Sequence, residues 1–188
     1  KNPTSVLRLL SAWDFINNAP FNEKPNISDF LRGEKPNWSL IGNSGYFARD
    51  IEDDVYDSIL DYCTSLSIRP KVSVILGSAG YGVTTLMMVL AKRAVWDKAG
   101  RIFFHKPFKD IREGDIEYAL SLSDDKAIFF IDNAADNIEI INTLYKKYND
   151  AKKSCMFILG ERKNEWQQVS SKLQADFFEI LPLSDGEI

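Results

Sequence analysis

The sequence is poor in the residues that build metal centres and disulfide frameworks. Its 188 residues include two cysteines, Cys63 and Cys155, and one histidine, His105. The cysteines lack the spacing of a zinc or disulfide motif and lie in apolar patterns, which favours buried thiols of a cytoplasmic protein. No apolar run reaches the roughly 18 residues of a membrane-spanning helix, so we expect no membrane partner.

Positive charge is scarce as well. The chain has 23 Lys and Arg against 27 Asp and Glu, which gives a formal net charge of −4. No long basic run is present, so the sequence does not indicate a nucleic-acid partner. An initiator methionine is also missing, and the last residues carry a helix-start pattern, Ser184 with Glu187, that no helix follows. We therefore expect a fragment of a larger protein.

The chain does have what a packed core needs, since 45% of its residues are hydrophobic and 12 are Phe. After residue 49, short strands that are apolar throughout alternate with amphipathic helices. The predicted strands are 72–76, 101–105, 127–131, 155–159 and 177–181, and the predicted helices are 55–66, 84–96, 113–122, 136–149 and 164–173. This alternation predicts an α/β fold with a parallel five-stranded sheet that helices cover on both faces.

Residues 1–48 have a different character. They hold four of the seven prolines, and we predict a lead-in segment that is mostly irregular or helical. Apolar residues at helical spacing predict a helix over 6–17. Ser28 is a candidate cap for a second helix, and the stretch around Trp38 is predicted to be irregular. The predicted division is therefore a lead-in over 1–48 and a main domain over 49–188.

The stretch from Lys71 to Leu86, KVSVILGSAGYGVTTL, has the strand–loop–helix order of a phosphate-binding loop. The signature of such a loop is G-x-x-x-x-G-K-[ST], and Gly77, Gly82 and Thr84 match it. Glycines let successive backbone N–H groups turn toward a phosphate, and the helix that follows adds the positive end of its dipole. The residues expected to contact a nucleotide are Gly77, Ser78, Ala79, Gly80, Tyr81, Gly82, Val83, Thr84 and Thr85.

Val83 replaces the lysine of that signature. The lysine adds a charge-assisted contact to the β- and γ-phosphates worth roughly 1.5–3 kcal/mol, so its loss predicts binding weaker by about one or two decades. Phosphoryl transfer should suffer more, because charge stabilisation carries most of that catalysis. A second interpretation stays open, since the same residues fit a glycine turn between a buried strand and a helix, with no ligand.

A second motif is AIFFIDNAADN, residues 127–137, an apolar strand that ends in an acid. We expect Asp132 to hold Mg²⁺ through water, opposite the Thr84 hydroxyl, which makes these two the candidate metal ligands. Asn133 stands where active relatives often carry a second acid, and an amide cannot accept a proton from the attacking water. The position of the motif, about 50 residues after the loop, favours this interpretation over a strand end that simply carries a polar residue.

The third stretch is FILGERKNEW, residues 157–166. Arg162 follows the fourth predicted strand. In P-loop ATPases with an extra strand between the loop strand and the acid-bearing strand, that fourth strand is central and its end faces the γ-phosphate. Arg162 is therefore a candidate γ-phosphate contact. A surface arginine paired with Glu161 or Glu165 explains the same residue, and both interpretations stay open.

Together the three motifs resemble the STAND class of P-loop ATPases, signal-transducing switches related to the AAA group, over roughly residues 49–188. The resemblance implies the strand order 5-1-4-3-2, and it places Arg49 near the adenine pocket. The stretch GERKNEW, 160–166, is similar to STAND modules of bacterial antiphage defence proteins. Val83 and Asn133 depart from the pattern and imply weak or absent hydrolysis.

The resemblance implies a regulatory switch that binds ATP and Mg²⁺ and lies between an effector domain and a sensor domain. ATP would hold one conformation or permit homo-oligomerisation. The residues with an implied catalytic role are Asp132, Asn133 and Arg162. The alternative is a nucleotide-free P-loop fold that serves as a scaffold for protein–protein interaction, and an active ATPase ranks third.

Overall fold

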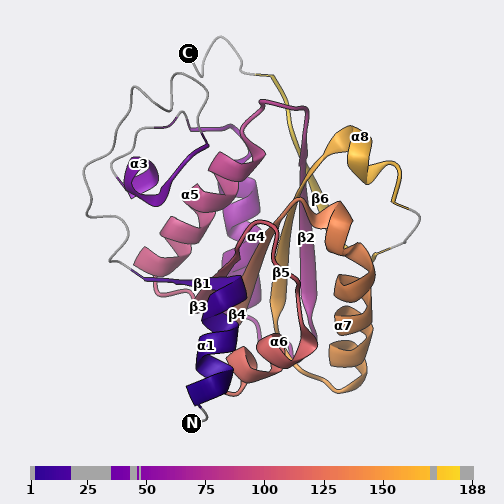
Figure 1. The fold of residues 1–188 in the computed structure, drawn as a ribbon. Helices are drawn as coiled ribbons and strands as arrows, with labels where there is room; N and C mark the ends of the chain where they lie inside the picture. Colours follow the sequence, from indigo (N-terminus) through magenta and orange to yellow (C-terminus); the bar gives the residue numbers. More distant parts are fainter. Residues whose placement is uncertain (1–2, 18–34, 43–45, 47, 170–172, 183–188) are drawn as a thin grey trace.

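The structure, a computed structural model, describes residues 3–17, 35–42, 46, 48–169 and 173–182. Six strands form one sheet with helices on both faces (Figure 1). The strands are β1 (Trp13–Ile16), β2 (Lys71–Gly77), β3 (Arg101–His105), β4 (Ala127–Asp132), β5 (Met156–Arg162) and β6 (Asp176–Ile180). The helices are α1 (Pro3–Ala12), α3 (Trp38–Gly42), α4 (Glu52–Thr64), α5 (Val83–Trp96), α6 (Glu113–Leu120), α7 (Ile138–Asp150) and α8 (Lys163–Trp166), with a 3-10 helix, η2 (Ala134–Asn137). Within the described part of the chain, none of the helices is long and apolar enough to cross a membrane.

The strand order is β1-β3-β4-β5-β2-β6, and all neighbours are parallel except β1, which is antiparallel to β3. The prediction of five parallel strands was therefore wrong in its count, and the order differs from the predicted one by a strand added beyond β3. Counted from the other edge, the remaining strands follow as β6-β2-β5-β4-β3. The α/β class with a mostly parallel sheet is confirmed, and β5 separates the loop strand β2 from β4.

The added strand comes from the lead-in. The predicted helix over 6–17 splits into α1 and β1, because Trp13 pairs with His105 and Ile16 pairs with Ile102 across the sheet edge. An unpaired edge of β3 would leave backbone groups without partners, and β1 satisfies them. Both Trp13 and Ile16 are buried, so their spacing of three fits a helical face and conceals the strand.

The second described piece of the lead-in is also ordered. Around Trp38 the chain forms the short helix α3 where the sequence predicted irregular structure. The Asn37 side chain accepts the backbone N–H of Leu40 at 2.9 Å, which is the contact of a helix N-cap. The buried Lys92 of α5 then donates from Nζ to the Ile41 carbonyl at 2.8 Å, at the other end of α3. The predicted cap Ser28 lies outside the described residues.

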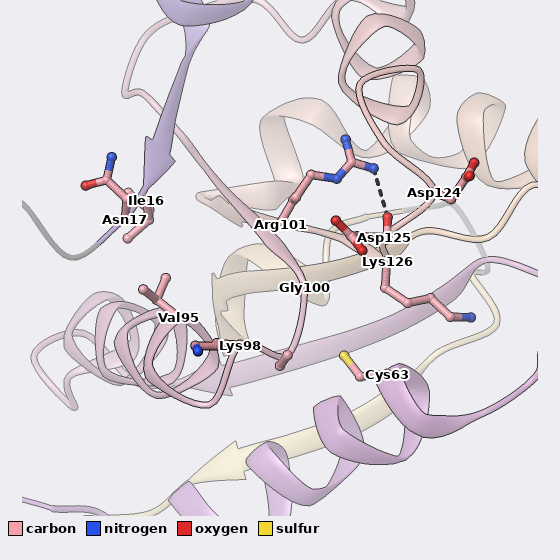
Figure 2. Close-up of a pocket in the computed structure, with 11 residues that line it drawn as sticks. Ile16, Asn17, Cys63, Val95, Lys98, Gly100, Arg101, Asp124, Asp125 and Lys126 are labelled. Carbon is pink, nitrogen blue, oxygen red and sulfur yellow. Dashed lines mark hydrogen bonds between the residues drawn. The ribbon is translucent and has the colours of Figure 1, made fainter.

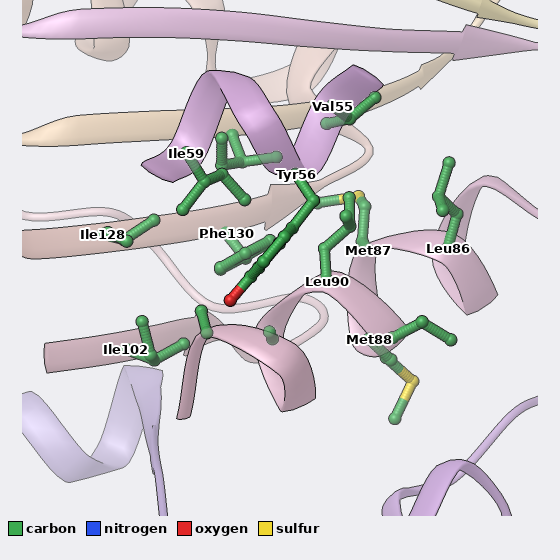
Figure 3. Packing of buried hydrophobic residues seen from close by; sticks show 14 of the residues in the cluster. Val55, Tyr56, Ile59, Leu86, Met87, Met88, Leu90, Ile102, Ile128 and Phe130 are labelled. Atoms are coloured by element: carbon green, nitrogen blue, oxygen red, sulfur yellow. The ribbon is translucent and has the colours of Figure 1, made fainter. Parts of the chain in front are cut away.

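The apolar strands serve two cores at once. Alternate residues of each strand point to opposite faces of the sheet. On one face Phe103 and Phe129 stack with ring centroids 5.1 Å apart, and on the other Phe104 and Phe130 stack at 5.8 Å. Helices α4 and α5 (Figure 3), together with α3, cover the second of these faces, and α1, α6 and α7 cover the first. This two-sided burial explains why the strands are apolar throughout rather than alternating.

Three helices end earlier than the sequence predicted, and one of them, α6, ends at Leu120 rather than Leu122. Helix α4 ends at Thr64, and Leu66 is 98% exposed rather than on the buried face. The hydroxyls of Thr64 and Ser65 bind carbonyls of the preceding turn at 2.9 and 2.8 Å, a local competition that favours a helix end. Helix α8 ends at Trp166, before two glutamines, and residues 170–172 of the predicted helix lie outside the described part.

His105, at the end of β3, is a buried titratable group that links the stability of the fold to pH. It is buried, with its ring centroid 4.9 Å from that of Trp13. Burial lowers the pKa of His105 below 6.5, although the Lys109 backbone and Asp110 oppose the shift. The unfolded chain therefore binds a proton more readily than the folded chain, so acid should destabilise the fold as the pH falls through 6.5.

We expect the free energy of unfolding of the parent to fall between pH 7.5 and 5.5 more steeply than that of His105→Phe. The phenyl ring keeps an aromatic contact with Trp13 but does not titrate. The difference in slope should be at most about 1.4 kcal/mol per pH unit, the effect of one proton. Urea titrations at a series of pH values measure it, and other titrating groups cancel because both proteins carry them. Parallel curves for the two proteins would show that His105 contributes nothing.

Candidate functional site

The glycine loop connects β2 to α5 at the carboxyl end of the parallel strands. Gly80 and Gly82 adopt φ angles of 83° and 86°, a left-handed conformation that L side chains rarely adopt. Gly82 is the N-cap of α5, and residues 78–80 are exposed. The loop is closed by the Tyr81 N–H, which donates to the Ser78 carbonyl at 3.0 Å. This is the arrangement that directs backbone N–H groups and a helix N-terminus toward an anion.

The two candidate metal ligands meet across the strand ends. The Thr84 hydroxyl donates to Asp132 Oδ2 at 2.8 Å, although the residues are 48 apart in the chain. Hydroxyl and carboxylate oxygens suit Mg²⁺, which at nucleotide sites takes one or two protein ligands and completes its shell with water and phosphates. In the part of the chain that the structure describes, no larger group of His, Cys, Asp and Glu gathers as a metal cage. The pair thus fits Mg²⁺ held together with a nucleotide.

Val83 packs where a lysine stem would run. A Cβ atom built on Gly77 would lie 2.8 Å from one methyl of Val83, and one built on Gly160 would lie 3.0 Å from the other. The Gly160 position would also come within 2.1 Å of Met87 Sδ and 3.3 Å of Asp132 Oδ1. Because Gly160 has no side chain, α5 approaches β5 closely and brings Thr84 beside Asp132.

Asn133 adopts φ 53° and ψ 55° at the N-cap of η2. Asparagine tolerates this left-handed region better than most residues do. The turn that follows presents the Ala135 N–H to Glu161. The position predicted to orient a water is therefore a strained turn residue at the strand end, directly after Asp132.

Glu161 is the residue that sequence reasoning missed, since it was considered only as a partner for Arg162. It is 2% exposed, and its carboxylate accepts the N–H groups of Ala135 at 2.7 Å and of Arg162 at 2.6 Å. Burial raises the pKa of Glu161, the two backbone donors oppose that shift, and the nearby Glu165 carboxylate adds to it. An acid inside an otherwise apolar strand is the signal that could have found it.

Arg162 ends β5 opposite Gly77, the first glycine of the loop, in the parallel register. Its guanidinium donates to Glu165 Oε1 at 3.1 Å, and the side chains are 56% and 41% exposed. Of the two partners suggested by the sequence, Glu165 therefore holds the guanidinium and Glu161 holds the backbone. The structure brings Arg162 to the edge of the sheet where the loop, Thr84 and Asp132 lie.

Arg49 joins the loop to the chain after β6. Its guanidinium donates to the Tyr81 carbonyl at 3.0 Å and also to the Leu181 carbonyl. Beside it lies a cavity of about 40 Å³, lined by residues 49–51 and 180–182. That volume suits about one water molecule, far below the several hundred Å³ of a typical ligand pocket. A purine would fit at Arg49 only if one of these segments moved.

A larger pocket, of about 630 Å³, lies at the opposite end of the strands, where β3 and β4 begin (Figure 2). Two of its three cations, Arg101 and Lys126, bind the protein itself. Arg101 donates to the carbonyls of Ser123 and Asp125 at 2.9 and 2.8 Å, and Lys126 donates to that of Ser67 at 2.7 Å. Burial raises the pKa of the Cys63 thiol to about 11, which makes it a poor nucleophile. Ligands of open α/β sheets bind at the carboxyl ends, so this pocket is not the nucleotide site.

A family model described as Novel STAND NTPase 5 matches residues 28–174. No curated protein matches the sequence. A chain of the HORMA–CdnC–Trip13 complex of E. coli MS115-1 is similar in fold, with a TM-score of 0.55 at 12% identity over 88% of this chain and 74% of that chain. S. cerevisiae Hsp104 bound to casein gives a TM-score of 0.53 at 13% identity over 79% of this chain and 30% of that chain. S. cerevisiae Hsp104 with ADP gives 0.51 at 14% identity over 94% and 31%. These neighbours are AAA+ P-loop ATPases, and this chain spans about a third of the Hsp104 chain.

Gly160 offers a direct test of the close approach between α5 and β5. We expect Gly160→Ala to lower the free energy of unfolding by about 1–3 kcal/mol, because the added methyl group overpacks the site against Met87 and Val83. Shortening the neighbour should relieve the clash, so Gly160→Ala with Met87→Ala should lose less than the sum of the two single changes. Denaturant unfolding of the four proteins measures this coupling. Strictly additive losses would mean that the two side chains do not compete for space.

Proposed function

The chain belongs to the Novel STAND NTPase 5 family, and we propose that it is a regulatory module that binds ATP with Mg²⁺ and hydrolyses it slowly or not at all. The phosphates would lie in the loop of residues 77–85, on the backbone N–H groups and the N-terminus of α5. The observation that carries this proposal is the 2.8 Å hydrogen bond between Thr84 and Asp132, beside a glycine loop with two left-handed glycines. A glycine turn with no ligand does not need this pair.

The proposed roles follow from the positions of the side chains. Thr84 and Asp132 would hold Mg²⁺, Asp132 through water, and the metal would neutralise charge on the phosphates. Asn133 would bind a water at the strand end without taking its proton. Arg162, at the register position of Gly77, would contact the γ-phosphate. A guanidinium can grip two phosphate oxygens, so it would partly replace the missing lysine.

The regulatory part of the proposal rests on what the site lacks. Val83 removes the lysine charge, and Asn133 removes the second acid, so the site is better suited to holding a nucleotide than to cleaving it. We propose the NTPase domain over 49–188 and a lead-in over 1–48, whose described elements α1, β1 and α3 pack against it. ATP would set the position of flanking effector and sensor domains of a signalling or defence protein, and would permit homo-oligomerisation.

A second candidate is a nucleotide-free P-loop fold that serves as a scaffold for protein–protein interaction. It is favoured by the 40 Å³ cavity beside Arg49, which is too small for a purine. Val83 favours it as well, because an apolar side chain seals the space between Gly77 and Gly160.

Nucleotide binding separates the two candidates. We expect ATP with Mg²⁺ to bind weakly, with a Kd on the order of 10–1000 μM, and Val83→Lys to tighten binding roughly tenfold or more by adding one charged contact. The substitution suits the space, since lysine is unbranched at Cβ and its stem would follow the path of Val83 over the two glycines. Isothermal calorimetry measures both affinities.

Val83→Met is the matched control, because methionine has a long unbranched stem without a charge. It should leave the affinity near that of the parent. No heat at millimolar ATP for the parent and for Val83→Lys alike would support the scaffold. If Val83→Met tightened binding as much as Val83→Lys, the gain would come from packing and not from charge.

Turnover is the second measurement. We expect steady-state phosphate release near background, and no recovery in Val83→Lys alone, because Asn133 cannot act as a base. Val83→Lys combined with Asn133→Asp has the better chance, since aspartate also tolerates the left-handed backbone at φ 53°. Adding Asp132→Asn to that double variant should abolish any gain by removing a metal ligand. Robust phosphate release from the parent protein would contradict the proposal of a non-hydrolysing switch.

A further inference from the structure

The side of the sheet on which Arg162 lies is set by strand alternation. Residues 156, 158, 160 and 162 of β5 share one face. Met156 and Ile158 pack in the core under α5, and the Gly160 position contacts Val83, Met87 and Asp132. The Cβ of Arg162 therefore lies on the face of the glycine loop, one step beyond Gly160. Glu161 lies on the opposite face, so the two adjacent residues serve different sides of the sheet.

The backbone of Arg162 is fixed independently of its side chain. The buried Glu161 carboxylate accepts the Arg162 N–H at 2.6 Å and, with its other oxygen, the Ala135 N–H at 2.7 Å. The guanidinium is thus the part of Arg162 that can change partner without moving the strand end.

In the structure that partner is Glu165, one helical turn onward, at 3.1 Å. Both side chains are about half exposed, so solvent screens their charges and keeps the pairing weak. Glu165 is also close enough to the buried Glu161 carboxylate to raise its pKa. Moving the guanidinium away from Glu165 would therefore leave that carboxylate without its cation, beside the buried carboxylate of Glu161.

We propose that Glu165 is an internal competitor of the nucleotide, a counter-ion that holds Arg162 until a γ-phosphate displaces it. This inference rests on the proposed function. It assigns to the same site a residue, Glu165, that sets the affinity for ATP and the preference for ATP over ADP. ATP brings a γ-phosphate that can take the guanidinium from a single exposed carboxylate. ADP lacks that group and leaves the Arg162–Glu165 pair intact.

The competition predicts a specific gain of function. Glu165→Gln keeps the size and hydrogen-bonding oxygen of the side chain but removes its charge, so Arg162 is released. We expect the affinity for ATP with Mg²⁺ to rise about two- to fivefold, the size of an exposed ion pair, and the affinity for ADP to change by less than that. Glu179→Gln is the matched control, since it removes the partner of Lys163 on the same short helix but not the partner of Arg162. It should change neither affinity.

Arg162→Ala completes the cycle. We expect it to lower ATP affinity by on the order of tenfold, the loss of about one charged hydrogen bond, and to leave ADP affinity nearly unchanged. In the Arg162→Ala background, Glu165→Gln should have no further effect, because the competitor has nothing left to hold. Calorimetric titration of ATP and ADP against the parent and these four variants supplies all the values, and a parallel set in Val83→Lys raises every affinity into an easier range.

Three results would overturn the proposal. The first is a gain in Glu165→Gln that is equal for ATP and ADP, or that persists without Arg162, since either shows general charge repulsion. The second is ATP binding that Glu165→Gln leaves unchanged, which removes the competition but leaves the proposed nucleotide site standing. The third is no binding by any variant in either background, which removes the proposed function itself and this inference with it.

Discussion

The close approach of α5 to β5 at Gly160 is the contact on which the candidate site depends. A Cβ at this position would fall 2.1 Å from Met87 Sδ, so a side chain there would force Met87, or the helix that carries it, to shift. The helix carries Thr84 in its first turn, and the neighbouring strand β4 ends at Asp132, which pairs in register with Gly160. The 2.8 Å contact between Thr84 and Asp132 is therefore set by dense packing one layer below it. The absence of a side chain at Gly160 thus positions Thr84 and Asp132 at the strand ends.

Sequence reasoning worked where burial leaves a pattern in the side chains. Strands β2 to β5 are apolar throughout because both faces are covered, and the meeting of Thr84 with Asp132 followed from placing both at carboxyl strand ends. It failed where backbone hydrogen bonds, rather than side-chain patterns, determine the structure. Strand β1 gains hydrogen bonds along the open edge of β3. The side chains of Trp13 and Ile16 do not reveal this pairing, because their spacing also fits a helix. It failed as well at Glu161, whose role is to accept two backbone N–H groups that no side-chain pattern specifies.

Electrostatics explains why so small a group as Glu165 can matter. With Val83 in place of lysine, the proposed attraction for phosphate would come from backbone dipoles, from a metal shared with the nucleotide and from Arg162. When a site has few cations, a carboxylate beside one of them lowers the affinity for phosphate more, because the phosphate must displace that carboxylate. A loop with its lysine would bind a nucleotide whether or not Arg162 were paired. In this chain the proposed binding would depend on one guanidinium, and that dependence would make the Arg162–Glu165 pair a control point.

Arg49 extends the same reasoning beyond the phosphates. It binds the Tyr81 carbonyl within the loop and the Leu181 carbonyl just after β6, so the loop, the segment before α4 and the chain leaving the sheet share one side chain. The cavity between these segments is too small for a purine. If a nucleotide base lies beside Arg49, as the family resemblance implies, it must displace residues 180–182 or residues 49–51. Binding would then be converted into movement by steric necessity, which requires occupancy of the site but no hydrolysis.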